Sequence, residues 1–381
     1  MSEYSWISSE HTVIERAQSI LASNHDAVLA TIVAVEGSAY RRPGAKMLVS
    51  DDGDILGSIT AGCLEDEVYT LAADVLAAGT PRLETFDLMQ DDVWGLGVGC
   101  NGVITILLEP VSTQLIPLIQ AYETRDSALI ATVLRSDNDN LDSWRRVSYT
   151  PEEGIVPADG GPPVPAWVQS SLEQPAAKLF GTQNSDSLWL NDPDGEACVF
   201  LDGIAPLPRL VAVGSNQDVR PVVELASKAG FQTTVVGYRG STATLEQFPN
   251  ADDVHSTSPA QIREAIEIDN QTYFAVMTHN FIDDRITVSQ VAETPTPYIG
   301  LMGPRDRFEE MLDAYDPESM PAPDNLSKVY TPIGLDLGGG SPYQIAFSIV
   351  SELLAVHNGR EPKHLQHREG SIHDHPELTS G

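Results

Sequence analysis

One stretch in the C-terminal half alternates strand, turn, helix and strand, and it constrains the fold more than any other part of the chain. It runs from Leu210 to Arg239 and reads LVAVGSNQDVRPVVELASKAGFQTTVVGYR. This order forms the βαβ unit of a parallel sheet, whose crossovers are right-handed. Similar apolar runs and helix-spaced segments follow it. We therefore predict an α/β fold with a Rossmann-like, doubly wound parallel sheet over residues 206–357.

The chain is too long for this domain alone. Its 381 residues exceed what one hydrophobic core usually serves, so further domains are expected. A helix-spaced segment, the strand AVLATIVAV from Ala27 and a hairpin signal predict an N-terminal α/β domain over residues 1–112. Weaker signals indicate a middle α+β segment over residues 113–205, and residues 358–381 form a polar tail.

The charge of the chain is strongly negative. It has 55 acidic residues against 22 basic ones, a net charge of −33. A surface of this sign repels a phosphate backbone, so we expect no nucleic acid partner. The acids are scattered singly and in pairs, which we interpret as a halophilic adaptation, because in molar salt screening shortens to about 3 Å.

Localisation and redox state are inferred from what the sequence lacks. Its apolar runs are far shorter than the roughly 20 residues that cross a bilayer, and the N-terminus has no secretory pattern. We therefore expect a cytoplasmic protein with no membrane partner. The three cysteines, Cys63, Cys100 and Cys198, form no C-x-x-C pair, which predicts reduced thiols and neither a disulfide framework nor a structural zinc site.

Cys63 follows Gly62 and precedes an acidic helix start in the stretch SITAGCLEDEV, residues 58–68. The positive end of a helix dipole lowers the pKa of a thiol, whereas Glu65 and the two acids after it raise it. These opposing effects predict a ligand-binding or moderately nucleophilic sulfur. The alternative is a small buried cysteine that fills a turn.

Cys100 lies in the glycine-rich stretch GLGVGCNG, residues 95–102, beside Gly99 and close to Gly102. A backbone without side chains lets a flat or phosphate-bearing ligand approach closely. The alternative is a tight turn between two strands. Cys198 reads as an ordinary strand residue and receives no role.

Three basic residues lie within six positions in GSAYRRPGAKMLV, residues 37–49: Arg41, Arg42 and Lys46. Bases are scarce in this chain, and the planar fork of arginine matches phosphate geometry. The cluster therefore predicts an anionic ligand. Solvated side chains or intramolecular ion pairs are the alternative.

The turn after the first strand of the Rossmann-like domain departs from a dinucleotide fingerprint. Gly214 is present, but Asn216 stands where the second glycine belongs, and the second strand ends without an acidic residue. Ordinary NAD(P) binding is therefore not favoured. His279, Arg305 and the segment Gly339, Gly340, Ser341 follow later strands, where open α/β sheets bind ligands. Satisfied loop and cap residues are the alternative for each of them.

Six motifs in the right order resemble the xanthine dehydrogenase accessory (XdhC/CoxI) family. The resemblance covers residues 1–110 and about 207–357, and the cysteine motifs match apart from Ala61 and Asn101. In the Rossmann-like domain the family's G-x-G-H and its aspartate are replaced. The six motifs are GSAYRRPGAKMLV, GSITAGCLEDEV, GLGVGCNGVITILLEP, VMTHNFIDD, PYIGLMGPRDR and PIGLDLGGGSPYQIAFSIVSELLA.

The resemblance implies a non-catalytic accessory factor that binds the molybdenum cofactor. Such a factor supports cofactor sulfuration and inserts the cofactor into a xanthine dehydrogenase or CO dehydrogenase-type molybdenum hydroxylase. Its implied partners are the apo-hydroxylase and a cysteine desulfurase-type sulfurase. Molybdopterin carries a ring, a phosphate and dithiolene sulfurs. The glycine loops suit the ring, the three bases suit the phosphate, and the soft thiols of Cys63 and Cys100 are candidate metal ligands.

Two other functions are compatible with these residues. One is an NAD(P)-dependent oxidoreductase that uses the C-terminal crevice, with His279 near the chemistry. The other is a docking protein that bridges a hydroxylase and its sulfurase without touching the cofactor. A homodimer is expected in each case.

Overall fold

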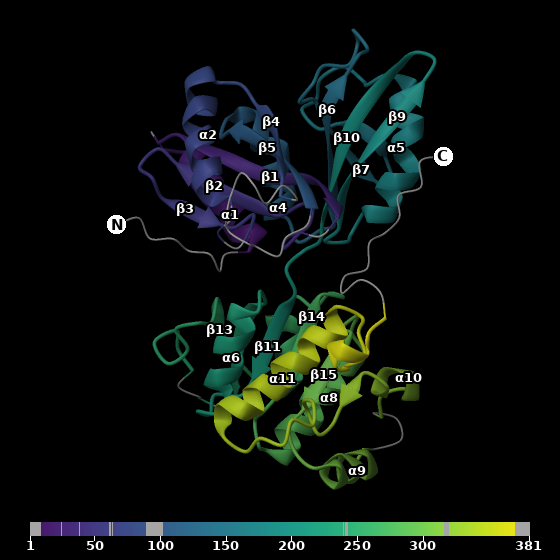
Figure 1. Ribbon diagram of the computed structural model, residues 1–381. Helices are drawn as coiled ribbons and strands as arrows, with labels where there is room; N and C mark the ends of the chain where they lie inside the picture. Colours follow the sequence, from purple (N-terminus) through teal and green to yellow (C-terminus); the bar gives the residue numbers. More distant parts are fainter. Residues whose placement is uncertain are drawn as a thin grey trace. The chain divides into compact units, whose positions relative to one another are not determined.

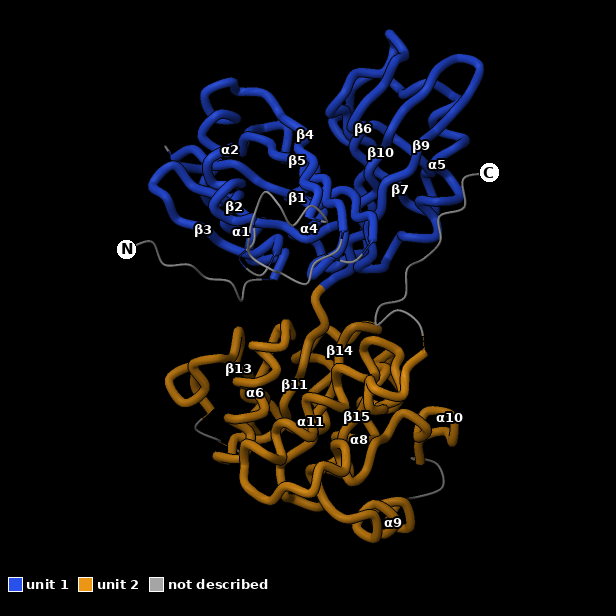
Figure 2. The backbone as a smooth tube through the Cα atoms, in the orientation of Figure 1, with its two compact units in different colours: residues 1–206, 374–381 blue, residues 207–373 orange. Residues whose placement is uncertain are grey.

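The computed structural model describes residues 9–23, 25–37, 39–60, 62, 64–88, 102–238, 240, 243–315 and 320–369. The chain divides into two compact units (Figure 2). The first lies within residues 1–206 and the second within residues 207–373. The N-terminal domain and the middle segment expected from the sequence thus belong to one compact unit.

The first unit begins with an antiparallel five-stranded sheet of order β3-β2-β1-β5-β4 (Figure 1). Apolar side chains of its second helix pack on the sheet, among them Val68, Ala72 and Val75. The helix ends at Gly79, whose φ of 66° is left-handed. The elements are α1 (Glu10–Leu21), β1 (Ala27–Gly37), β2 (Lys46–Ser50), β3 (Ile55–Gly57), α2 (Glu65–Ala78), β4 (Arg82–Asp87) and β5 (Gly102–Pro110).

A second antiparallel sheet of the first unit has the order β8-β7-β6-β10-β9. Its long helix packs Val168, Leu172 and Ala176 into a separate core. The elements are η1 (Thr113–Leu115), α4 (Ile116–Glu123), β6 (Ala128–Ser136), β7 (Arg146–Thr150), β8 (Gly154–Pro157), α5 (Ala166–Leu179), β9 (Ser185–Asp192) and β10 (Gly195–Ile204).

The second unit is a parallel six-stranded sheet of order β13-β12-β11-β14-β15-β16, which confirms the predicted Rossmann-like domain. Its elements up to the third helix are β11 (Arg209–Val213), α6 (Val219–Lys228), β12 (Gln232–Tyr238), β13 (Asp253–Thr257), η2 (Pro259–Gln261), α7 (Ile262–Ala265), β14 (Thr272–Val276) and α8 (Phe281–Ala292). The remaining elements are β15 (Tyr298–Leu301), α9 (Arg305–Asp313), α10 (Pro323–Leu326), β16 (Val329–Tyr330), α11 (Pro342–His357) and η3 (Leu365–His367).

Helices cover both faces of this sheet, as a doubly wound fold requires. Leu210 and Ala212 of β11 face a core shared with α6 and α11, whereas Val211 and Val213 face a core shared with α7, α8 and α9. The strand order reverses between β11 and β14, because β12 and β13 extend to one side and β15 and β16 to the other. Open α/β sheets bind ligands at this switch point.

Two helices of the second unit begin with side-chain caps. Ser341 accepts a hydrogen bond from the backbone of Gln344, whose side chain reaches back to the Ser341 backbone, and Pro342 occupies the first turn. Asn280 caps α8 with its side-chain oxygen, which accepts hydrogen bonds from the backbone N–H groups of Ile282 and Asp283. In the part of the chain that the structure describes, no helix is both long and apolar enough to span a membrane.

Candidate functional site

The strand registers bring the flanks of three predicted motifs to one end of the first sheet. Gly37, at the end of β1, pairs with Gly102, at the start of β5, and Met47 of β2 pairs with Gly57, at the end of β3. The backbone N–H of Leu88, just after β4, donates to Gly102 O at 3.0 Å. This end is therefore where three segments leave or enter the sheet: the base-rich turn (39–45), the cysteine loop (58–64) and the glycine-rich connection (89–101).

Glu65 organises the cysteine loop. Its buried carboxylate accepts hydrogen bonds from Ser58 Oγ at 3.0 Å, from the Thr60 backbone N–H at 2.9 Å and from Thr60 Oγ1 at 2.6 Å. It also accepts one from the Leu64 backbone N–H at 3.1 Å. Thr60 and Leu64 stand on either side of residues 61–63. One carboxylate therefore fixes both ends of the segment that carries Cys63.

The same hydrogen bonds set the protonation of Glu65. Burial alone raises the pKa of this carboxyl, but the donors of Thr60 and Ser58 lower it, and the resulting pKa lies below 4.5. Glu65 thus binds groups of its own chain as an anion. It shapes the loop through these bonds and was predicted from the sequence as a cofactor-binding residue.

The other predicted residues of these two loops are described only in part. Gly62 is exposed and has a φ of 104°, a left-handed conformation that a side chain would strain. Gly102 begins β5 and is buried. Cys63, Gly99 and Cys100 lie outside the described residues, so their proposed ligand roles stay predictions.

The two basic residues of the base-rich turn and Lys46, which begins β2, are held differently. Arg41 forms an ion pair with Glu10, and its side chain is 29% exposed. The Lys46 side chain is enclosed, and Nζ lies 2.7 Å from Asp202 Oδ2 and 3.0 Å from Gly44 O. An enclosed, ion-paired ammonium cannot reach a ligand in solvent. Lys46 therefore belongs to the interior of the first unit, and Arg41 and Arg42 remain the candidates for an anionic group.

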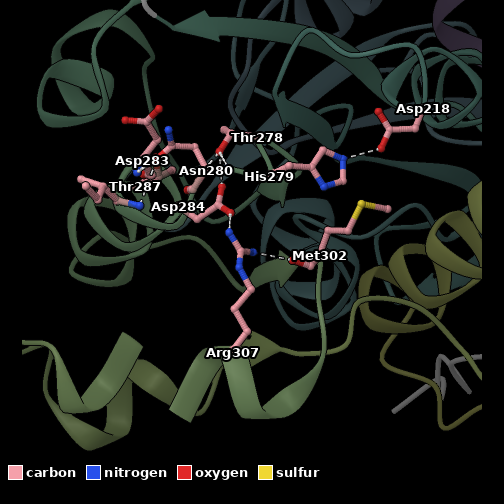
Figure 3. A network of polar contacts seen from close by, with 10 residues as sticks. Asp218, Thr278, His279, Asn280, Asp283, Asp284, Thr287, Met302 and Arg307 are labelled. Carbon is pink, nitrogen blue, oxygen red and sulfur yellow. Dashed lines mark hydrogen bonds and ion pairs between the residues drawn. The ribbon is translucent and has the colours of Figure 1, made fainter. Parts of the chain in front are cut away.

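In the second unit, His279 and Asp218 face each other across the switch point (Figure 3). Asp218 precedes α6 in the turn after β11, His279 follows β14, and His279 Nε2 lies 2.8 Å from Asp218 Oδ2. His279 has a φ of 58°, which is uncommon for a residue with a side chain. Gly214 is required here, because a Cβ would lie 2.6 Å from Met277 O.

A second polar cluster lies beside this pair (Figure 3). Asp284, fully buried in the first turn of α8, accepts a hydrogen bond from Thr278 Oγ1 and lies 2.6 Å from Arg307 Nη2. Arg307 Nη1 donates to Met302 O at 3.0 Å. This network ties together the segments that follow β14 and β15.

The remaining predicted residues of the second unit are spread along its loops. Arg305 is exposed at the start of α9, two residues from the ion-paired Arg307. Gly339 and Gly340 are exposed before α11, and Ser341 caps that helix. Ser341 thus has the cap role that was the alternative for it, while Arg305, Gly339 and Gly340 stay predictions.

Sequence reasoning missed the acidic partners. Asp202 lies in a segment to which no chemistry was assigned, yet it neutralises Lys46 from 156 residues away. The position of Asp218 is visible in the sequence, because it stands just before α6, where an aspartate usually caps the helix. It makes no side-chain cap hydrogen bond here and instead pairs with His279.

This geometry defines a two-unit α/β protein. The flanks of its two cysteine-bearing segments lie at one end of an antiparallel sheet, and its Rossmann-type sheet lacks a dinucleotide fingerprint. Residues 210–353 match the model of the XdhC Rossmann domain, and residues 20–87 match that of the XdhC and CoxI family. A probable subunit of xanthine dehydrogenase from Bacillus subtilis is 30% identical over 347 residues, which cover 90% of this chain and 96% of that protein. The chain belongs to the XdhC and CoxI family, as its motifs predicted.

Two further relatives cover almost the whole chain. The molybdenum cofactor insertion chaperone PaoD of Escherichia coli is 22% identical over 357 residues, 93% of this chain and 91% of that protein. A crystal structure of a xanthine dehydrogenase from Bacillus halodurans superposes with a TM-score of 0.71 at 29% identity, and the match covers 91% of this chain and 96% of that one.

Proposed function

We propose that this protein binds the molybdenum cofactor and delivers it to a xanthine dehydrogenase or CO dehydrogenase-type molybdenum hydroxylase, with support for cofactor sulfuration by a cysteine desulfurase-type sulfurase. The relationship to a molybdenum cofactor insertion chaperone supports the cofactor and the hydroxylase partner. Family membership supports an accessory role.

The observation that carries this proposal is the convergence of the flanks of three motifs at one end of the first sheet. The flanks of the cysteine loop, the base-rich turn and the glycine-rich connection all lie there. A cofactor with a flat ring, a phosphate and soft sulfur or metal atoms needs bare backbone, arginine and thiolate in one place. When bound, molybdopterin would supply the molybdenum and its dithiolene. The chain would supply Cys63 and Cys100 as soft ligands and Arg41 and Arg42 for the phosphate.

A Cys63→Ala variant should lose most of the pterin that the purified wild-type protein retains, by about tenfold or more. Oxidative release of the fluorescent pterin, quantified per chain, measures this. Cys198→Ala is the matched control, since Cys198 belongs to β10, outside the three motifs in sequence, and burial raises the pKa of its thiol. Equal retention in Cys63→Ala and wild type would remove this thiol from the site, and wild-type protein without pterin would contradict cofactor binding.

An NAD(P)-dependent oxidoreductase is the second candidate, because the second unit has the switch point of a nucleotide-binding sheet. Two features oppose it. Asp218 places a carboxylate at the N-terminal end of α6, where a pyrophosphate would need positive potential. The end of β12 offers Gly237 and the buried Tyr238, whose hydroxyl is engaged with Thr287, in place of an acid for the ribose.

Titration with NADH and NADPH in high salt is therefore expected to give no fluorescence transfer at low-micromolar concentrations. The measurement excites the tryptophan and tyrosine side chains and records the emission of the reduced nucleotide. Adenosine monophosphate serves as a competitor. Saturable transfer that the competitor reverses would favour the oxidoreductase.

A further inference from the structure

The two sheets of the first unit are built in the same order. Along the chain, the first sheet and its helices follow the order α1, three strands, α2, two strands. The second sheet and its helices follow the same order: α4, three strands, α5, two strands. The strand orders β3-β2-β1-β5-β4 and β8-β7-β6-β10-β9 correspond strand for strand. We call residues 10–110 the first copy and residues 116–204 the second copy.

Irregular features recur at matching positions. Val33 is an extra residue in β1 between Ile32 and Ala34, and Leu134 is an extra residue in β6 at the matching place. The turns that follow also match: Gly44 has a φ of 96° and Trp144 has a φ of 71°. A tryptophan rarely adopts this conformation. Its presence where the other copy has glycine indicates that the backbone course was kept while the residue changed.

The hydrogen bonds of the two turns agree in the same way. Gly44 N–H donates to Ile32 O at 2.8 Å, and Trp144 N–H donates to Val133 O at 2.7 Å. Both strands that follow begin with a base opposite a threonine of the central strand. The register thereby equates these pairs of residues: Thr31 with Thr132, Lys46 with Arg146, Leu107 with Phe200 and Glu109 with Asp202.

Two buried ion pairs join the copies reciprocally. Lys46 Nζ of the first copy lies 2.7 Å from Asp202 Oδ2 of the second, and Arg146 Nη2 of the second lies 2.5 Å from Glu109 Oε2 of the first. Each base therefore binds the acid of the other copy. Residue i meeting residue j while j meets i is the contact pattern of a two-fold symmetric dimer.

Apolar residues at the join obey the same symmetry. One core cluster consists of two matching pairs, the two bulge residues Val33 and Leu134 and the two strand residues Leu107 and Phe200. We infer that the first unit is an internal dimer, in which the second copy is a built-in partner that holds the base-rich turn of the first copy through Asp202.

The second copy has lost the segments that make the first a candidate ligand site. Its loop before α5 reads ADGGPPVP, residues 158–165, in place of the cysteine loop. Only Pro193 and Asp194 connect β9 to β10, where the first copy has the glycine-rich connection. The internal dimer therefore carries one ligand site per chain.

The second copy holds the base-rich turn of the first copy in place. Asp202 Oδ1 accepts a hydrogen bond from Ser185 Oγ at 2.7 Å, while its other oxygen holds Lys46, which in turn donates to Gly44 O. A Cβ on Gly44 would lie 2.6 Å from Ser185 Oγ, so the turn packs directly on the second copy. Asp202 is thus a positioning residue for Arg41 and Arg42, an assignment that rests on the proposed cofactor binding.

The reciprocity makes a matched pair of variants, Asp202→Asn and Glu109→Gln, each tested in the full chain. Hydrogen–deuterium exchange should accelerate about tenfold in residues 39–45 for Asp202→Asn and in residues 138–145 for Glu109→Gln, with the other turn unchanged in each. Both variants should lower the Tm, by roughly 10 °C, because each leaves a buried base without its acid. Exchange that rises in the same turn for both variants, or in neither turn, would overturn the internal dimer.

Pterin retention separates position from stability. Among folded molecules, Asp202→Asn should retain about fivefold less pterin than wild type, because the turn that carries Arg41 and Arg42 loosens, whereas Glu109→Gln should retain the wild-type amount. Should Asp202→Asn not fold, Ser185→Ala provides the same comparison with a milder change. Equal retention in both variants would remove the positioning role. A wild-type protein without pterin contradicts the proposed function alone, and the exchange result still decides the internal dimer.

Discussion

An Asp284→Asn variant is expected to unfold with a free energy about 3 to 5 kcal/mol below that of the wild type. The Asp284 carboxylate is fully buried and meets both Thr278 Oγ1 and Arg307 Nη2. An amide keeps the shape but removes the charge that neutralises the guanidinium, and its NH2 group cannot accept a hydrogen bond. Urea-induced unfolding in high salt, followed by circular dichroism, measures the difference.

A control variant and a double variant test whether this loss comes from the buried ion pair. Arg305→Gln changes an exposed arginine on the same helix as Arg307 and should alter the free energy by less than about 0.5 kcal/mol. The double variant Asp284→Leu with Arg307→Met removes both charges and should recover much of the loss, because apolar groups of similar size replace a buried pair well. A loss below about 1 kcal/mol in Asp284→Asn would mean that the network does not stabilise the segments that follow β14 and β15.

The parallel sheet was predictable because its signals are local. Apolar runs, a glycine turn and helical spacing follow one another from Leu210 to Arg239, and each element is buried as its pattern indicates. The capping of α11 was equally visible, since Ser341 and Pro342 adjoin the helix that they begin. Interactions between residues that are close in the chain can be predicted from the local sequence.

The ion pairs were not predictable, because their partners are far apart in sequence. Lys46 was predicted to bind a phosphate because bases are scarce in this chain. In the structure it forms an ion pair with Asp202, which lies in a strand without any predicted motif. The duplication was hidden for a related reason. Fold order, bulge and turn conformation persist between the copies, while residue identity changes, as between Gly44 and Trp144.

The candidate site was predictable only as separate pieces. The sequence shows two cysteine-bearing glycine stretches and one basic turn, but nothing local says that they share a location. That information resides in the registers, which pair Gly37 with Gly102 and Met47 with Gly57. A pairing shift of one residue would send the side chains to opposite faces, so register is set by burial over the whole sheet.

A Glu65→Gln variant is expected to lose about 2 to 3 kcal/mol of unfolding free energy at pH 7, because hydrogen bonds to a charged group contribute about this much. Four donors from Ser58, Thr60 and Leu64 converge on this carboxylate. A neutral amide has one acceptor oxygen only, and its two N–H groups would face donors that need an acceptor. With the cysteine loop released, pterin retention should fall as strongly as in Cys63→Ala.

The difference should depend on pH in one direction. The folded pKa of Glu65 is lowered, so its stabilisation is complete above about pH 4.5 and is lost as the pH falls through the folded pKa. Wild type and Glu65→Gln should therefore converge in stability toward pH 3. Glu67→Gln is the control from the same helical turn: burial raises the pKa of Glu67, and its Oε2 has no hydrogen-bond partner, so this change should be neutral or slightly stabilising at pH 7. A stability gap between wild type and Glu65→Gln that stays constant from pH 7 to pH 3 would show that the charge of Glu65 does not hold the loop.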